Sequence, residues 1–230
     1  MSIRVLQGDP DIMLTLRRSA RARRMTLRIS RFDGRVTLTL PTRASEREAI
    51  AFAQQKQDWI RQHLATWDGT VSVILGGAIP VEGVMRDIHA GAGRTVALDP
   101  ETLLVPGPEA RVPARTLGFL KARARDRLAA ASDHYAARLG RSYSALSIRD
   151  TRSRWGSCSS AGRLMYSWRL IMAPPQVLDY VAAHEVSHLA QMNHSPAFWA
   201  EVARIHGPYD DARRWLRTHG NELHRYRFGD

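Results

Sequence analysis

The 230-residue sequence has one cysteine, Cys158, and two lysines, Lys56 and Lys121. A single cysteine excludes an intrachain disulfide, and no early segment has the apolar core of a signal peptide, so a cytoplasmic location is expected. The most apolar stretch, residues 71–85, is interrupted by glycine, proline and glutamate. It is too short and too broken to cross a bilayer, so we expect no membrane span.

Basic charge is abundant by contrast, since 34 basic residues face 22 acidic ones and the net charge is +12. Nearly all of the basic residues are arginines, which stay charged at any working pH. Half of the excess lies in residues 1–68, where 13 basic residues face 7 acidic ones. This excess favours contact with a polyanion such as nucleic acid, nucleotide phosphate or an anionic membrane surface. The alternative is that arginine simply occupies solvated faces evenly.

The first half of the chain predicts a small sheet followed by a helix. Apolar residues alternate with polar ones in 25–29 and again in 36–40, on either side of an Asp33-Gly34 turn, which predicts a β-hairpin. Ser45 and Glu48 have the spacing of a capping box and predict a helix that ends at about Trp67. The expected buried stripe of this helix is Phe52, Trp59, Ile60 and Leu64. Short apolar pieces between 71 and 105 predict a second sheet or an extension of the first.

A proline-rich stretch at 106–113 is the expected domain border, and residues 114–139 predict one long helix. Strands are expected at 145–148 and 164–171, and a helix at about 175–192 that starts at a proline pair. The predicted fold class is α+β. An amino-terminal β-rich domain with a helix spans 1–110, and a second domain that contains the 175–192 helix spans 111–230.

The most informative pattern is His184-Glu185-Val186-Ser187-His188 within that last helix. Residues four apart lie on one helix face, so both histidines can bind the same ion. Glu185 is displaced by about 100° and can reach a water on the metal without being a ligand, as the general base of a zinc hydrolase does. Independent placement of histidine and glutamate gives about 0.01 expected occurrences of this pattern. The alternative is a pair of packed histidines without a metal.

A catalytic zinc site needs a third protein ligand, and His194 is the first candidate. On an unbroken helix His194 would point away from the ion, so the helix must end first. Asn193 in a left-handed conformation and Pro196 would end it, and a turn at residues 192–193 would return His194 to the metal. The rival ligands are Glu201, His206 and Glu222.

Four segments together resemble the YgjP-like zinc metallopeptidase family. They are Arg152-Ser-Arg-Trp-Gly-Ser-Cys-Ser, Trp168-Arg-Leu-Ile-Met-Ala-Pro-Pro, Asp179-Tyr-Val-Ala-Ala-His-Glu-Val-Ser-His-Leu and Met192-Asn-His-Ser-Pro-Ala-Phe-Trp. The resemblance implies a zincin-like carboxy-terminal domain in which His184, His188 and His194 bind zinc and Glu185 is the catalytic acid and base. A more distant similarity is to SprT-like proteases. Some members of the family carry a nucleotide pyrophosphatase label, which leaves the substrate open.

Other residues near these motifs have two interpretations each. Arg152 and Arg154 could contact an oxyanion or a phosphate, or could be exposed loop residues. Tyr209 could supply a phenol to the same oxyanion, or could pack. Cys158 could approach zinc as a thiolate, although a small core cysteine is the commoner role. Four aromatic residues are expected to pack around the histidine-bearing helix, namely Trp155, Trp168, Phe198 and Trp199.

Three functions fit these observations. The leading hypothesis is a zinc peptidase that acts on a peptide or protein, with Zn²⁺ as cofactor. The second keeps the metal but takes a nucleoside triphosphate, whose phosphates the arginines would neutralise. The third is a basic nucleic-acid-binding protein with a structural metal, which would require four protein ligands rather than three ligands and a water.

Overall fold

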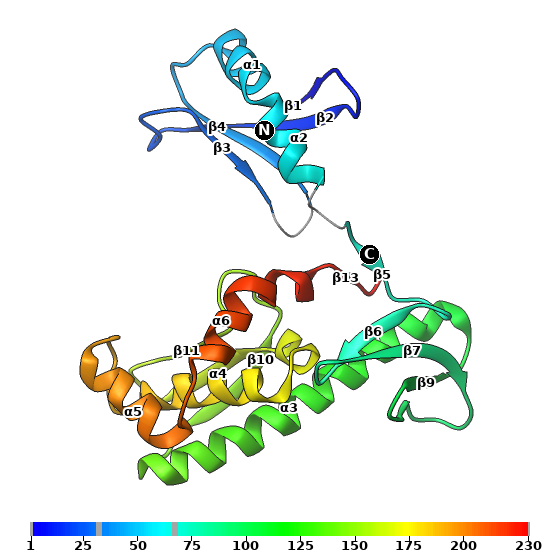
Figure 1. Ribbon diagram of the computed structural model, residues 1–230, viewed down its shortest axis with the longest axis vertical. Helices are drawn as coiled ribbons and strands as arrows, with labels where there is room; N and C mark the ends of the chain where they lie inside the picture. The colour runs from blue at the N-terminus through cyan, green and yellow to red at the C-terminus, as the bar shows by residue number, and fades with distance from the viewer. Residues whose placement is uncertain (1, 31–33, 66–68, 230) are drawn as a thin grey trace. The chain divides into compact units, whose positions relative to one another are not determined.

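The computed structural model describes residues 2–30, 34–65 and 69–229. Contacts within the chain divide it into two compact units, an amino-terminal unit of residues 1–70 and a carboxy-terminal unit of residues 71–230 (Figure 1). Both units mix helices with sheets, as the α+β prediction requires. Within the described ranges, no helix combines the length and the apolar character needed to span a membrane.

The amino-terminal unit is a four-stranded sheet with helices on one face. Its elements are β1 (Ser2–Leu6), β2 (Ile12–Ser19), β3 (Thr26–Ile29), β4 (Val36–Pro41), α1 (Glu46–Gln55) and α2 (Gln57–Ala65). The strand order is β1-β2-β4-β3, in which β2 and β4 are parallel and the other two pairs antiparallel. Alternate residues of the strands, such as Leu14, Leu16 and Leu38, are buried and form the core together with Ala49, Ala53 and Ile60.

The predicted hairpin is confirmed, because β3 pairs with β4 and Leu27 lies opposite Leu38. The capping box of Ser45 and Glu48 is confirmed too. Asp33, in the predicted turn, and Trp67, the predicted helix end, lie outside the described residues. The helix is not continuous, since it breaks at Lys56.

This break changes which side chains are buried. Ile60 is fully buried as predicted, but Trp59 is 41% exposed, so its place in the buried stripe was wrong. Phe52 and Leu64 are only half-buried, and the small residues Ala49 and Ala53 take the central positions against the sheet. Alanines allow the helix backbone to approach the strands closely, which leaves the larger side chains at the margin.

The first half of the carboxy-terminal unit is a second sheet on a long helix. The sheet has the order β6-β7-β9-β8. Its strands are β6 (Ala78–Val81), β7 (Val84–Gly91), β8 (Ala97–Leu98) and β9 (Thr102–Pro106), and η1 (Glu109–Arg111) leads into α3 (Val112–Leu139). A separate short pair joins β5 (Val71–Ser72) to β13 (Tyr226–Arg227) in parallel.

The predicted domain border at residue 110 is therefore corrected to residue 70. Ile79, Ile88 and Leu103 of this sheet belong to the same core as Leu120 of α3 and the residues of α4. The proline-rich stretch at 106–113 is a tight connection inside one unit, because β9 leads directly to a helix that packs against it.

The second half of the unit contains a three-stranded sheet and the histidine-bearing helix. Strands β10 (Ala145–Arg149), β11 (Gly156–Cys158) and β12 (Arg163–Ser167) have the order β10-β12-β11, so β11 is an edge strand. The predicted strand at 164–171 ends at Ser167 and becomes the buried 3₁₀ helix η2 (Trp168–Met172). The remaining elements are α4 (Pro175–Ser187), α5 (Pro196–His206), α6 (Asp210–His219) and η3 (Gly220–His224).

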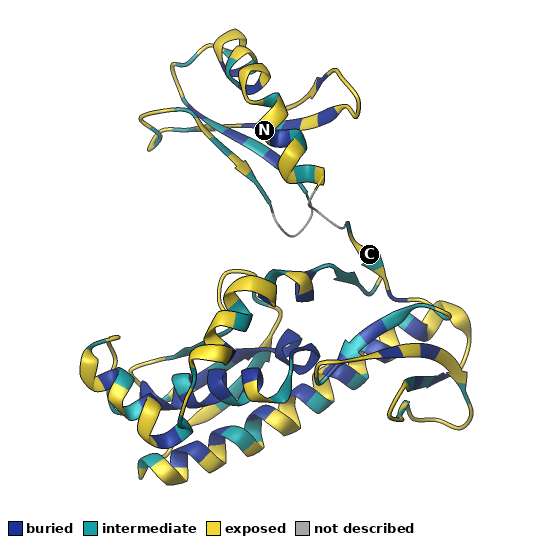
Figure 2. Ribbon diagram, viewed as in Figure 1, coloured by how far each residue is buried: buried dark blue, intermediate teal, exposed yellow. Residues whose placement is uncertain are grey.

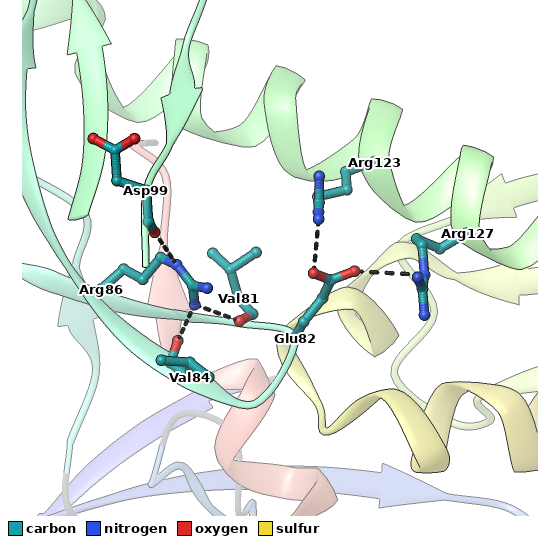
Figure 3. Close-up of polar contacts among 7 residues, drawn as sticks. All are labelled: Val81, Glu82, Val84, Arg86, Asp99, Arg123 and Arg127. Carbon is teal, nitrogen blue, oxygen red and sulfur yellow. Dashed lines mark hydrogen bonds and ion pairs between the residues drawn. The ribbon is translucent and has the colours of Figure 1, made fainter. Parts of the chain in front are cut away.

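Helix α4 is the most enclosed helix of the carboxy-terminal unit, with buried residues on every side (Figure 2). It packs against α3, α5, α6 and β11. The β6–β7 turn bonds to η2, which immediately precedes α4: Glu82 has a φ of 52° and its amide donates to the carbonyl of Ile171 at 2.7 Å. The next residue, Gly83, lies against Pro174 at the start of α4. The Glu82 carboxylate pairs with Arg123 at 2.7 Å and Arg127 at 3.5 Å, both on α3 (Figure 3).

The same turn is tied back to its own sheet by Arg86. This side chain is 9% exposed, and its guanidinium donates to the carbonyls of Val81, Val84 and Asp99 at 2.8, 3.0 and 2.8 Å (Figure 3). A buried guanidinium is stable only when its donors are satisfied, and here backbone oxygens satisfy it. The turn is thus fixed on both sides, against its own sheet and against the start of α4.

Candidate metal centre

Helix α4 places His184 and His188 one turn apart, and His194 joins them from the segment before α5. One ring nitrogen of each of the three histidines lies within 4.8 Å of the others. The Nε2 atoms of His184 and His194 are 3.1 Å apart. Two nitrogens bound to one tetrahedral zinc at about 2.0–2.1 Å lie about 3.4 Å from each other. The spacing of these donors therefore fits a single metal ion.

The chain reverses earlier than predicted. Helix α4 ends at Ser187 instead of residue 192, and the amides of Leu189 and Ala190 bond to carbonyls three residues back. Asn193 does not have a positive φ, since Glu82 is the one non-glycine residue with that conformation in the described parts of the chain. A tight turn immediately after His188, rather than a left-handed residue at 193, brings His194 to the other two histidines.

This turn also orients His188. The Nδ1 atom of His188 lies 3.0 Å from the carbonyl oxygen of Gln191. That contact requires a proton on Nδ1, which leaves the lone pair of Nε2 available to a metal. His188 is 8% exposed, and burial lowers its pKa, so the neutral form that binds metals is favoured.

The ring of Phe198 forms the base of the histidine cluster. Its centroid lies 4.9, 4.4 and 4.8 Å from the ring centroids of His184, His188 and His194, and it is fully buried. Trp199 lies 5.7 Å from the rings of His184 and His194. The prediction that these two aromatic residues support the site is confirmed. Trp155 and Trp168 belong to the same hydrophobic core as α4, and their rings contact His224 and Phe228, respectively.

Glu185 lies in the same cleft as the histidines but is not one of the three clustered donors. The cleft measures about 460 Å³. It is lined by residues 153, 154 and 156–158, from β11 and the segment before it, and by Glu185, Met192 and the three histidines, from α4 and the segment after it. Glu185 is 6% exposed, and burial raises its pKa to about 8, an effect that the charge of Arg154 opposes. Burial lowers the pKa of His184 to about 3, with further contributions from His188, His194 and Arg213.

Gly156 of β11 permits the close approach of this strand to Glu185, and sequence reasoning did not single it out. A Cβ at this position would lie 2.5 Å from Cγ of Glu185 and 2.6 Å from its Oε1. A glycine inside a strand often marks such an approach, so the signal was present in the Trp-Gly-Ser-Cys run. Gln191 was also missed, and no signal exists for it, because only its backbone takes part.

A family model of the YgjP-like metallopeptidase domain matches residues 23–219. The chain belongs to the YgjP-like family. It is accordingly a metal-dependent peptidase, and its three-histidine group agrees with that membership. Among solved structures, the metallopeptidase zymogen abylysin of Pyrococcus abyssi has 19% identity and a TM-score of 0.36, with 40% of this chain and 94% of that chain covered. No curated protein matches the chain.

Three residues of this YgjP-like chain were predicted to contact an oxyanion or a phosphate, and only one of them lines the cleft. Arg154 lines the cleft, whereas Arg152 is exposed and is among the charges that influence His224. Tyr209 stacks between Tyr180 and Trp199, at centroid distances of 5.8 and 5.4 Å, which is the packing role considered from sequence.

The rival ligands have other partners, and Cys158 is not one of the clustered donors. Glu201 pairs with Arg204 at 2.7 Å and Glu222 with His219 at 2.9 Å. His206 contacts the rings of Tyr135 and Tyr180. Cys158 lines the cleft half-buried, and burial with the nearby Glu185 raises its pKa to about 11. Its thiol is therefore neutral and a poor metal ligand in this state.

Proposed function

We propose that the protein is a zinc peptidase in which His184, His188 and His194 hold the metal and Glu185 is the catalytic acid and base. The observation that carries the proposal is the convergence of three imidazole nitrogens beside a buried carboxylate in one cleft. Three neutral imidazoles suit zinc, and three protein ligands are typical of catalytic rather than structural zinc sites.

The chain's own residues divide the work of peptide hydrolysis. When bound, zinc supplies a Lewis acid that polarises the peptide carbonyl and makes a water more acidic. Glu185 accepts the proton of the attacking water at its carboxylate and donates it to the nitrogen of the departing amine. The contact of His188 with the Gln191 carbonyl keeps Nε2 directed at the metal position.

Arg154 is proposed as the cationic group that faces the oxyanion. It lines the cleft, and its charge acts on the Glu185 carboxylate, whose pKa it lowers against the effect of burial. A guanidinium directed at developing negative charge stabilises the transition state. Arg152 and Tyr209 are not part of the cleft lining, so we assign them no such contact.

Metal analysis and one protein substrate test this proposal. We expect one zinc per chain in the wild type, loss of zinc in His188→Ala, and retained zinc with hydrolysis of casein reduced at least about 100-fold in Glu185→Gln. Unchanged zinc in His188→Ala would remove the metal assignment. Full activity of Glu185→Gln would remove its catalytic role, and hydrolysis of nucleoside triphosphates with casein left intact would make the protein a pyrophosphatase instead.

A further inference from the structure

The amino-terminal unit has a groove that takes no part in the metal centre. It measures about 420 Å³ and lies beside β3, one of the two edge strands of its sheet. Helix α2 packs next to this strand (Figure 1). Half-buried Met25, Leu27 and Phe52 line the groove and provide an apolar surface continuous with the core of this unit.

Trp59 is the exposed aromatic residue of this groove. Its side chain is 41% exposed, although its position in an amphipathic helix predicted burial. The ring of His63 lies 4.2 Å from that of Trp59, and Nδ1 of His63 lies 2.9 Å from the Trp59 carbonyl oxygen. The indole is thus held in place by a neighbouring turn while much of its surface faces solvent.

The groove that contains this indole carries positive charge. Arg24 and Lys56 line the groove, and no acidic residue is among the side chains that line it. Arg21 and Arg23 extend the charge along the β2–β3 connection, and both are exposed. Arg28 is exposed too, but it alternates in β3 with Leu27 and Ile29, which pack on the core, so its side chain lies on the other face of the sheet. Within the described residues, none of these five cations has a hydrogen bond or an ion pair through its side chain. Their charge is available to a ligand.

We propose that this groove binds single-stranded nucleic acid, with a base stacked on Trp59 and the adjoining phosphates held by Arg24 and Lys56. A charged groove with an exposed aromatic ring is the arrangement by which proteins bind single strands without sequence preference. Guanidinium groups match phosphate oxygens in pairs, which suits a surface built almost entirely from arginine. A duplex does not offer the face of a base to the indole. This binding goes beyond the peptidase activity and does not depend on it.

An acidic peptide is the competing occupant, because it could extend the sheet at the free edge of β3. Such a peptide would pair with the backbone of β3 and would have no need of an exposed indole. Exposed cations also continue past the groove, at Arg21 and Arg23. A polynucleotide carries one charge per nucleotide and could contact them in succession. These two observations favour the polynucleotide.

The salt dependence of oligonucleotide binding measures how many phosphates the protein contacts. The probe is a fluorescein-labelled oligothymidylate of 12 nucleotides, and its anisotropy is followed with the full-length protein between 50 and 300 mM salt. For single strands the slope of log affinity against log salt changes by about 0.7 per phosphate contact. We expect Arg24→Ala/Lys56→Ala to reduce the slope by about 1.4. The matched control Arg43→Ala/Arg47→Ala removes two exposed charges of the same unit outside the groove and should leave the slope unchanged.

Substitution of the indole tests stacking separately. We expect Trp59→Ala to weaken binding about ten- to hundredfold and Trp59→Phe, which keeps an aromatic face, to restore most of it. A 12-base-pair duplex and polyglutamate should compete poorly. Equal binding by Trp59→Ala, or an equal loss of slope in the control pair, would overturn the proposal. Displacement of the probe by polyglutamate, with the same dependence on Arg24 and Lys56, would assign the groove to an acidic peptide. Thermal unfolding of each variant checks that it folds.

Discussion

At the residue scale, the space around Glu185 is set by what Gly156 lacks. Strand β11 passes so close to the carboxylate that only a hydrogen fits between them. A larger residue at position 156 would therefore change the position of the proposed general base, Glu185, as well as that of the strand. A methyl group there would have to displace either the edge strand or the carboxylate.

We expect Gly156→Ala to reduce peptide hydrolysis at least about tenfold while zinc content stays at the wild-type level, since the added Cβ would lie 2.5 Å from Cγ of Glu185. Steady-state kinetics and metal analysis of the same preparation check this. Gly118→Ala is the control, because a Cβ on that residue of α3 would meet nothing within 4 Å. The control should keep full activity and gain up to about 1 kcal/mol of stability. Equal activity of the two variants would refute the steric argument.

His224, which is not one of the three clustered histidines, makes the stability of the folded protein depend on pH. It is 4% exposed, and burial lowers its pKa from 6.5 to about 4. The charges that influence it are Arg169, Asp150, Arg152 and Arg227. Between pH 4 and 6.5 the unfolded chain binds the proton and the folded chain does not, so stability falls as the pH falls through this window.

In the wild type the free energy of unfolding falls between pH 6.5 and pH 4, and we expect His224→Phe to remove up to about 3 kcal/mol of that decrease. The phenyl ring would fill the same place against Trp155 but has no proton to bind. Urea unfolding of wild type and variant at pH 4.5, 5.5 and 7 measures the difference. Parallel pH dependences in the two proteins would show that His224 is not responsible.

At the scale of elements, local signals were reliable at helix starts and weak at helix ends. Ser45 and Glu48 set the start of α1 through two hydrogen bonds that the sequence itself encodes. The end of α4 at Ser187 is accompanied by a contact between His188 and the carbonyl of Gln191, and residues 189–192 are ordinary helix formers that give no sign of it. The break at Lys56 has no comparable signal in the sequence, and the burial of Trp59 beyond it was mispredicted.

The contact between the β6–β7 turn and Pro174 can be tested by substitution of Gly83. We expect Gly83→Ala to destabilise the carboxy-terminal unit by about 2–4 kcal/mol, because Gly83 has a φ of 78° and a Cβ would lie 2.8 Å from Cα of Pro174. Gly93→Ala has a comparable φ of 84° but open space around it, so it should cost only about 1 kcal/mol. Denaturant unfolding of both variants isolates the contact with Pro174. Equal costs would mean that the contact contributes nothing.

At the scale of the whole molecule, the histidine motif was predictable because its spacing is local, and the domain organisation was not. The pairs β2–β4, β7–β9 and β10–β12 are parallel and join strands that are distant in sequence. No local pattern reveals such pairings. Prolines at 106–113 resemble a linker, yet Val105 and Val112 on either side are both fully buried in one core.

Two fragments distinguish the observed border from the predicted one. We expect residues 71–230 to fold alone and bind one zinc, because their core is complete. Residues 111–230 should not fold, since they lack the sheet that covers α3 and the Glu82 turn that holds the start of α4. Circular dichroism and zinc analysis of both fragments test this. A folded, zinc-binding 111–230 fragment would restore the border at 110.

The scarcity of lysine gives this molecule a natural labelling pattern. Lys56 is exposed in the groove of the amino-terminal unit, and Lys121 is exposed on α3 of the carboxy-terminal unit. Amine-directed reagents therefore find one side chain in each unit, while the arginines remain untouched. Acetylation could neutralise the cation of Lys56 in the groove but could alter little else of the protein's charge, which is carried almost wholly by groups that such chemistry does not reach.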